Sequence, residues 1–345
     1  MVACMLGAAA AEGAERPNPG AAALAGRTPI RLILDSDMDS DCDDAGALAV
    51  LHALADRGEA ELLGIMISSL DPHAGPCADA INTYYGRPDL PIGVARPPAP
   101  NQKSKYTRGV AERSKHDLPP GDKAPDAVQL YRRILSAQPD QSVTVATIGD
   151  MTNLAKLFRT PAEGDLPSGA DLVRAKVKLW VCMGGNFIGK PARDDLKLGN
   201  NNFTLDPKAS YEAITNWPTP IVFVGREVCS VPSGLKAGAR LRETPADNPV
   251  RIAYELYFGG EARDRHVADQ ATVLYAVRGL GDYWDAEGAG GMDLRPDMTF
   301  TWSYEKPRRQ AYLLKRMENG KPNDRRIEQI IEGLMTQPPR KQSPR

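Results

Sequence analysis

Six aspartates fall within ten consecutive positions of this chain, directly after a short apolar run. They are Asp35, Asp37, Asp39, Asp41, Asp43 and Asp44. Two carboxylates in close contact repel by about 1 kcal/mol in bulk water and by about 4 kcal/mol near a protein surface. A folded site that turns several of them inward therefore needs a bound cation or raised pKa values. Because every ligand here is an oxygen, calcium or magnesium is favoured over zinc.

The surrounding sequence predicts where these acids lie in the fold. Residues 30–34 and 62–67 are short apolar runs and predict two buried strands. Between them, residues 45–55 carry apolar side chains at helical spacing, with Asp43 and Asp44 at the expected start of a helix. A strand–helix–strand unit of this length makes the two strands parallel. The acids therefore lie at the carboxyl edge of a sheet, where open α/β folds bind ligands.

The remaining elements predict an open, mostly parallel, Rossmann-like α/β sheet with helices on both faces. Residues 96–124 form a long polar loop, which is typical of a lid, a binding loop or a mobile segment. Residues 299–304 and 311–314 are predicted to be a terminal strand pair. Other strands are expected at 92–94, 143–148, 176–183 and 220–225, and helices at 78–85, 127–137, 248–258, 268–278 and 324–335.

Composition excludes several classes of partner. The chain has 345 residues and a formal net charge of −1, so no basic excess indicates nucleic-acid binding. No polybasic run or long apolar segment indicates a membrane partner. The five cysteines form no CxxC pair, which argues against a zinc site or a disulfide framework.

One α/β domain is expected over residues 28–336, because no internal repeat or linker interrupts it. Residues 1–27 are rich in Ala and Gly and are predicted to be disordered or signal-like. An apolar start followed by small residues favours a periplasmic or secreted location over the cytoplasm, although a basic n-region is missing. Residues 337–345 are rich in Pro, Lys and Arg and are predicted to be a disordered tail.

Four motifs, in this order, resemble the inosine/uridine-preferring nucleoside hydrolase family. The turn from Asp35 to Ala45 is similar to the family's DxDPGxDDA turn but two residues longer, like the DTDMGxDxDDA form of a bacterial branch. Residues 149–155 are similar to the family's GPLTNLA, residues 183–186 to its MGG segment, and residues 266–271 to its late aspartate before a helix. The resemblance covers residues 31–304 and implies a nucleoside hydrolase-like fold.

The resemblance also implies an activity: calcium-dependent hydrolysis of the N-glycosidic bond of ribonucleosides, giving free base and ribose, as in purine or pyrimidine salvage. By this resemblance Ca²⁺ is held by Asp37, Asp44, the carbonyl of Thr152 and Asp269. Asp37 is also the catalytic base, which activates a water on the metal. A metal and a carboxylate suit a reaction that passes through an oxocarbenium-like state. The implied partner is a small nucleoside-like substrate, and a homodimer or homotetramer is compatible with it.

The same resemblance implies a set of residues on the substrate side. Asp35 is expected to be a supporting acid there, and either Asp41 or Asp43 binds the ribose, because of the two inserted residues. Asn200 replaces a glutamate that usually holds the sugar, and Ala268 replaces a histidine that protonates the leaving purine in some members. The leaving group therefore stays open. The full set is Asp35, Asp41, Asp43, Asp71, Asn186, Asn200, Asn202 and His266.

Two other functions fit parts of the sequence. Asp35-Ser-Asp after a strand is similar to the nucleophile and acid of haloacid-dehalogenase-like phosphohydrolases, but Asp39 stands where those proteins have Thr or Val. A non-catalytic sugar- or calcium-binding relative is the second alternative, and the changes at Asn200 and Ala268 favour it. An EF-hand fits less well, because Cys42 stands at the position of the turn glycine, counting from Asp37.

Overall fold

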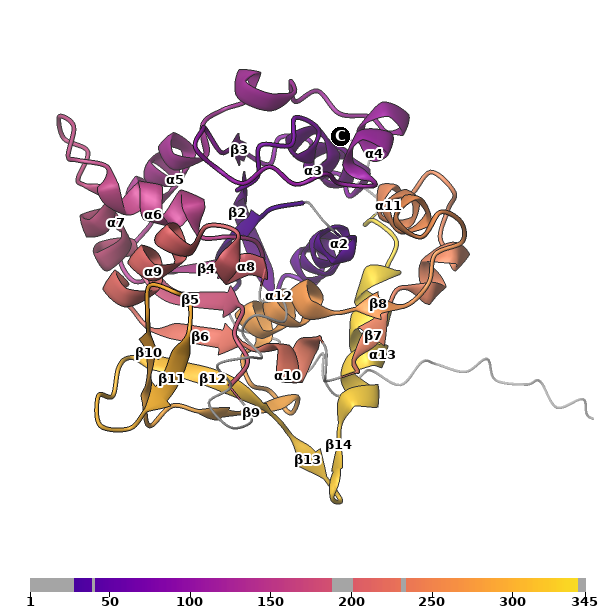
Figure 1. Cartoon of the computed structure of the whole chain (residues 1–345). Coiled ribbons are helices and arrows are strands. Elements are labelled where there is room, and N and C mark those ends of the chain that lie inside the picture. The colour runs from indigo at the N-terminus through magenta and orange to yellow at the C-terminus, as the bar shows by residue number, and fades with distance from the viewer. Residues whose placement is uncertain (1–27, 39–40, 188–200, 231–233, 341–345) are drawn as a thin grey trace, which may run out of the picture.

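An eight-stranded sheet with the order β3-β2-β1-β4-β5-β6-β12-β9 organises the chain (Figure 1). The computed structural model describes residues 28–38, 41–187, 201–230 and 234–340. Neighbouring strands are parallel from β3 to β12, and β9 alone joins this sheet antiparallel. This confirms the predicted sheet. Its strands are β1 (Ile30–Ser36), β2 (Ala60–Ile67), β3 (Ile92–Val94), β4 (Val143–Thr147), β5 (Val177–Met183), β6 (Ile221–Val224), β9 (Trp284–Glu287) and β12 (Gln310–Lys315).

Helices cover both faces of the sheet, and each face has its own hydrophobic core. Leu32 and Leu34 of β1 face the core that contains α2, α3, α12 and α13, whereas Ile33 faces the core that contains α5, α6, α7 and α9 (Figure 1). Among the described helices, none is both long and apolar enough to span a bilayer. The helices are α2 (Asp43–Asp56), α3 (Ala74–Tyr84), α4 (Thr107–Arg113), α5 (Ala127–Ser136), α6 (Thr152–Arg159), α7 (Gly169–Lys176), α8 (Asn201–Thr204), α9 (Pro207–Asn216), α10 (Arg226–Cys229), α11 (Pro249–Phe258), α12 (Ala268–Arg278) and α13 (Asp324–Met335).

Three short antiparallel pairs and two turns of 3₁₀ helix complete the described elements. They are β7 (Lys236–Ala237) with β8 (Arg265–His266), β10 (Gly291–Leu294) with β11 (Phe300–Ser303), β13 (Met317–Glu318) with β14 (Lys321–Pro322), η1 (Gly121–Lys123) and η3 (Ala239–Glu243).

The structure corrects two predictions. The expected terminal strand pair is wrong, because β11 pairs with β10 whereas β12 pairs with β6 and β9. The polar segment 96–124 is not a plain loop, since it contains α4 and η1. Gln337, the first residue of the predicted tail, accepts a hydrogen bond from Arg57 Nε at 2.8 Å, and the domain bounds stay a prediction. The predicted N-terminal segment 1–27 lies outside the described residues.

His52 of α2 is fully buried and predicts how stability depends on pH. Its ring stacks on Tyr85 and its Nε2 lies 2.9 Å from Asn82 Oδ1. Burial, followed by the charge of Arg87, lowers the pKa of His52 from 6.5 to about 3. The unfolded chain therefore binds a proton that the folded chain does not between these two values. Stability from this group is present above pH 6.5 and is lost as the pH falls towards 3.

We therefore expect the wild-type protein to lose about 1.4 kcal/mol of unfolding free energy per pH unit below 6.5, relative to the His52→Gln variant. Denaturant unfolding of both proteins at several pH values between 5 and 7.5 measures this difference. If the unfolding free energies of the two proteins changed equally with pH, His52 would not be the source of the pH dependence.

Candidate active site

The end of β1 carries Asp35, the first acid of the segment. Asp35 is fully buried on the side of α5, where Tyr131 Oη donates to one carboxylate oxygen at 2.9 Å and Asn153 Nδ2 donates to the other at 3.1 Å. Burial raises the pKa of the Asp35 carboxyl well above its ordinary value, and the hydrogen bond from Tyr131 opposes this shift. Both oxygens are occupied, which fits a supporting acid behind the site.

The buried state of Asp35 also decides against the phosphohydrolase alternative. In that reaction the first aspartate of the Asp-Ser-Asp segment attacks phosphorus and needs a carboxylate oxygen facing the substrate. Asp35 is 0% exposed, and each of its oxygens already accepts a hydrogen bond. The contacts of Asp35 therefore argue against the phosphohydrolase alternative.

The turn after β1 is fixed by Asp44, which reaches back from α2. Ser36 Oγ donates to Asp44 Oδ1 at 2.5 Å, and the main-chain N–H of Met38 lies 3.2 Å from the same oxygen. Met38 has a φ of 50°, in the left-handed region that few residues other than glycine adopt. The hydrogen bonds to Ser36 and Asp44 hold Met38 in this conformation and fix the direction in which the acidic loop leaves the strand.

Asp37 is held by main-chain contacts with two neighbouring loops. Its carbonyl accepts a hydrogen bond from Ser69 Oγ at 2.7 Å, in the loop after β2. On the other side lies Gly149, after β4: a Cβ added there would lie 2.6 Å from the Asp37 nitrogen and 2.9 Å from its Cβ. Only glycine leaves room for Asp37, which is 7% exposed. This contact explains why position 149, at the start of the 149–155 motif, is a glycine.

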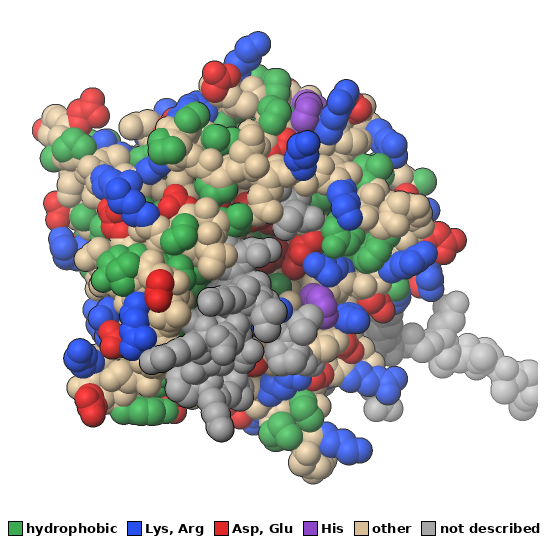
Figure 2. Space-filling model, viewed as in Figure 1, with side chains coloured by type: hydrophobic (Ala, Val, Ile, Leu, Met, Phe, Trp, Pro, Cys, Tyr) green, Lys and Arg blue, Asp and Glu red, His purple; other side chains and the backbone are tan. Residues whose placement is uncertain are grey.

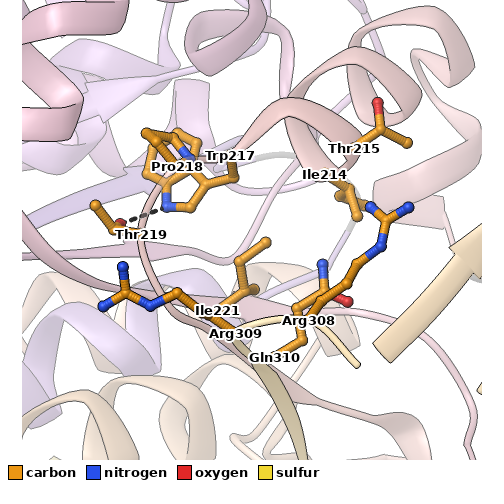
Figure 3. A pocket seen from close by; sticks show the side chains of 9 residues that line it. All are labelled: Ile214, Thr215, Trp217, Pro218, Thr219, Ile221, Arg308, Arg309 and Gln310. Carbon is orange, nitrogen blue, oxygen red and sulfur yellow. Dashed lines mark hydrogen bonds between the residues drawn. The ribbon is translucent and has the colours of Figure 1, made fainter. Parts of the chain in front are cut away.

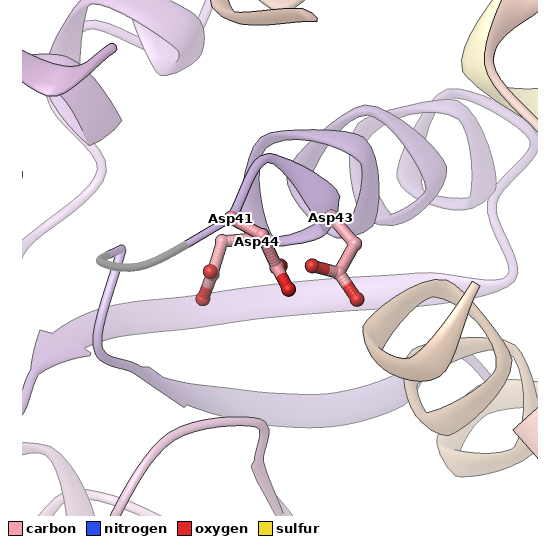
Figure 4. Close-up of side chains that lie close together, drawn as sticks. All are labelled: Asp41, Asp43 and Asp44. Carbon is pink, nitrogen blue, oxygen red and sulfur yellow. The ribbon is translucent and has the colours of Figure 1, made fainter. Parts of the chain in front are cut away.

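Asp41, Asp43 and Asp44 form an acidic cluster at the start of α2, with one oxygen of each within 4.8 Å of the others (Figure 4). Asp43 and Asp44 are buried, and Asp43 Oδ1 has no hydrogen-bond partner among the residues that the structure describes. Acidic side chains are visible near the middle of the face shown in Figure 2. Oxygen donors this close, with one buried and unpartnered, could hold a metal ion.

Asp269 brings the second half of the chain to the same place. It lies in the first turn of α12 and is 5% exposed. Burial, and after it the charges of Asp44, Asp41 and Asp37, raise the pKa of Asp269 well above its ordinary value. The helix that carries Asp269 also packs against α2, which carries Asp44.

Arg265 is a residue of this site that the sequence did not reveal. Its Nη2 donates to Asp41 Oδ2 at 2.6 Å, and its guanidinium lies 5.4 Å from the centre of the Tyr257 ring. The charge of Asp41 is therefore balanced by a neighbouring cation, whereas Asp43 has a buried oxygen without such a partner. The only sequence signal was the position of Arg265 next to His266.

Thr152 begins α6, and two acids orient it. Its N–H donates to Asp150 Oδ1 and its Oγ1 donates to Asp206 Oδ2, both at 2.9 Å. Asp206 also caps α9 by accepting from the N–H of Ala209. Two elements far apart in sequence thus hold the residue whose carbonyl the family resemblance assigns to the metal. Asp150 and Asp206 were not predicted.

The three asparagines of the predicted substrate side differ in their contacts. Asn202 Nδ2 donates to the carbonyl of Ile148 at 2.9 Å and to that of Met183 at 3.3 Å, so it links the ends of β4 and β5. Asn186 follows β5, and its Oδ1 is buried with no partner in the described part of the chain. Asn200 lies outside the described residues.

Asp71 and His266 complete the predicted set. The carboxylate of Asp71 accepts from the N–H of His73 at 2.9 Å and from Thr107 Oγ1 at 2.5 Å, so it ties the loop after β2 to α4. His266 pairs with β7, and its Nδ1 is buried without a partner within the described ranges. Burial, followed by the charge of Arg265, lowers the pKa of His266, so its neutral form dominates at neutral pH.

Two cavities lie away from the acidic cluster. One, of about 340 Å³, lies beside the first residues of β6 and β12 and is lined in part by Trp217, Arg308 and Arg309 (Figure 3). These are the amino ends of the strands, so this cavity is at the sheet edge opposite the acids. The second, of about 420 Å³, is lined by residues of α3, β3 and α5. Neither contains a predicted site residue.

Comparison with known proteins gives one family. The profile described as inosine-uridine preferring nucleoside hydrolase matches residues 32–312. No match was found among curated proteins. Three of the solved structures that share the fold are compared with this chain. The inosine-uridine preferring nucleoside hydrolase from Bacillus anthracis is 16% identical, has a TM-score of 0.63 and covers 89% of this chain and 99% of its own.

The other two are similar over comparable lengths. The purine-preferring ribonucleoside hydrolase from Gardnerella vaginalis is 14% identical, with a TM-score of 0.64 and coverage of 89% of this chain and 98% of its own. The type III effector protein XopQ, solved as a complex with adenosine diphosphate ribose, is also 14% identical, with a TM-score of 0.60 and coverage of 92% and 98%.

Proposed function

This chain belongs to the inosine-uridine preferring nucleoside hydrolase family and so hydrolyses nucleosides, and we propose that it does so with calcium, cleaving the N-glycosidic bond to give free base and ribose. The observation that supports this proposal is the packing of α12, which carries Asp269, against α2, which carries Asp44, with the charges of Asp44 and Asp37 acting on the Asp269 carboxyl. A solvated acidic loop would have no reason to lie beside a buried carboxylate from the second half of the chain. A metal site needs ligands from several directions, and Asp269 can supply one of them.

The residues present fit a hard divalent cation. Asp37, Asp44, Asp269 and the carbonyl of Thr152 are the donors that we assign to it, and all of them offer oxygen. Asp43 lies beside Asp44 in the acidic cluster. When bound, calcium would lower the pKa of water, orient the hydroxyls of the sugar and offset the repulsion among the carboxylates.

Asp37 is assigned as the general base. It is nearly buried, its main chain is fixed by Ser69 and Gly149, and it shares the carboxyl edge with the acidic cluster. Because its main chain is fixed at this edge, Asp37 is placed to take the proton from the attacking water. Departure of the nucleobase leaves positive charge on the ribose ring. The surrounding carboxylates stabilise this charge.

For the ribose hydroxyls, the contacts favour Asp43 over Asp41. Asp41 is already paired with Arg265, whereas Asp43 and Asn186 each have a buried oxygen without a partner among the described residues. A sugar diol supplies the hydrogen-bond donors that these oxygens lack. Asp43 and Asn186 are therefore our assignment for sugar recognition. His266, which is mainly neutral, is not assigned to protonate the leaving group.

The test is release of reducing sugar from a panel of inosine, uridine, adenosine, guanosine and adenosine diphosphate ribose. The last compound is included because XopQ, a protein of this fold, was solved with it. We expect ribose release from at least one nucleoside, loss of that activity with EDTA, and its return on adding calcium. Calcium binding without turnover of any panel member would instead support the non-catalytic alternative.

A further inference from the structure

Glu227 is a buried carboxylate at the carboxyl edge of the sheet, outside the acidic cluster. It belongs to α10, which follows β6, and it is 5% exposed. Its Oε1 accepts a hydrogen bond from the main-chain N–H of Phe187 at 3.2 Å. Its Oε2 is buried with no partner in the parts of the chain that the structure describes. A carboxylate is expensive to bury with so few donors, so stability alone does not account for it.

The main chain around Glu227 is built to admit this contact. A Cβ added to Gly225 would lie 2.4 Å from Oε1 and 2.6 Å from Oε2 of Glu227, so only glycine leaves room for the carboxylate. The N–H of Arg226 donates to the carbonyl of Gly185 at 3.0 Å. The start of α10 is therefore joined to the turn after β5 by a main-chain bond and by the Glu227 carboxylate.

The turn that Glu227 contacts carries Asn186. Gly185 has a φ of 88°, so this turn depends on a conformation that only glycine adopts easily. Phe187 closes the turn: its ring stacks on Tyr312 at 4.7 Å between centroids, and its N–H is held by Glu227. Asn186 lies between these two fixed residues. Its direction is thus set by the contacts of its neighbours.

We infer that Glu227 is a positioning residue for sugar binding, which fixes the Gly184–Phe187 turn through the Phe187 N–H and so directs the side chain of Asn186. This inference rests on the proposed function, in which Asn186 contacts the sugar. The packing of α10, which carries Glu227, against α12, which carries Asp269, gives a second link to the site.

The test is the kinetics of Glu227→Ala and Glu227→Gln with the nucleoside that the wild-type protein turns over best. Alanine removes the acceptor of the Phe187 N–H, and we expect KM to rise at least about tenfold with a smaller fall in kcat. Glutamine keeps an acceptor oxygen, and its KM should stay within about threefold of wild type. If Glu227→Ala does not fold, Gly225→Ala displaces the same carboxylate and should reproduce the rise in KM.

A double-mutant cycle with Asn186→Ala decides whether Glu227 acts through Asn186. In that background, Glu227→Ala should raise KM no further, since the side chain that it positions is absent. The control is Asp79→Ala on α3, which removes another buried acceptor of main-chain N–H groups, those of Asp117 and Leu118. It should lower the melting temperature and leave KM unchanged.

Two results would overturn the inference: an unchanged KM in a folded Glu227→Ala or Gly225→Ala protein, or additive effects of the Glu227 and Asn186 substitutions. Either result leaves the proposed function standing, because the wild-type protein still turns over nucleoside. Failure of the proposed function is separate, since the wild-type protein itself would then release no ribose.

Discussion

Asp37→Asn is expected to lower kcat by about 10³-fold while leaving the protein folded, which is the range that loss of a general base produces. Asparagine has nearly the shape of aspartate, so the close contact of Gly149 with the main chain and Cβ of residue 37 is preserved. The amide cannot take a proton from water, and it is a weaker ligand for a cation. Ribose release measured at saturating calcium and nucleoside reports the loss.

The stability of this variant separates catalysis from folding. Asp37 lies among like charges, and its charge contributes to the raised pKa of Asp269. Without calcium, removal of one charge from this group should leave the melting temperature unchanged or raise it. Asp79→Asn, a change of the same type at a buried acid of α3, is the control and should keep full activity. Turnover at the wild-type rate by Asp37→Asn would remove Asp37 as the base.

Gly149→Ala is expected to lower kcat/KM by about 10²-fold and the unfolding free energy by about 1–3 kcal/mol, the usual range for an overpacked site. The added methyl would lie 2.6 Å from the Asp37 nitrogen and 2.9 Å from its Cβ. These are main-chain and Cβ positions, which cannot rotate away as the end of a flexible side chain can. The loop after β1 must shift, and Asp37 shifts with it.

Gly333→Ala is the matched control for this substitution. Gly333 lies in α13, and an added Cβ would meet no atom within 4 Å. Alanine favours a helix interior over glycine by up to about 1 kcal/mol, so this variant should be equally or more stable and fully active. Chemical denaturation and nucleoside kinetics on both variants give the comparison. If Gly149→Ala kept wild-type kcat/KM, the close contact between residue 149 and Asp37 would not be required for activity.

The charges of the site explain how its acids are distributed in the fold. Asp37, Asp43 and Asp44 lie within one short segment and repel one another in the absence of a cation. The fold offsets this by placing Arg265 against Asp41 and by sending Asp35 to the other side of the sheet, where Tyr131 and Asn153 bind it. The remaining acids face the carboxyl edge together with Asp269, which concentrates negative charge where a metal ion would bind.

The sequence by itself determined the elements and the edge on which the site lies. Apolar runs of strand length and helical periodicity are local signals, and the predicted helices at 268–278 and 324–335 have the bounds of α12 and α13. The acidic turn and Gly149 directly follow predicted strands, and because parallel strands end at one edge, their approach could be predicted without coordinates. Asp269 lies in the first turn of a helix, and only the family resemblance placed it with them.

Only the tertiary structure decided the partners of each side chain. The pairs Asp41–Arg265, Thr152–Asp206 and Glu227–Phe187 join residues of different elements, and no local spacing encodes them. The same holds for β11 and β12, which follow one another in the chain but pair with different strands. Periodicity reports which face of an element is buried, whereas the atom that meets a given carboxylate depends on how all the elements pack.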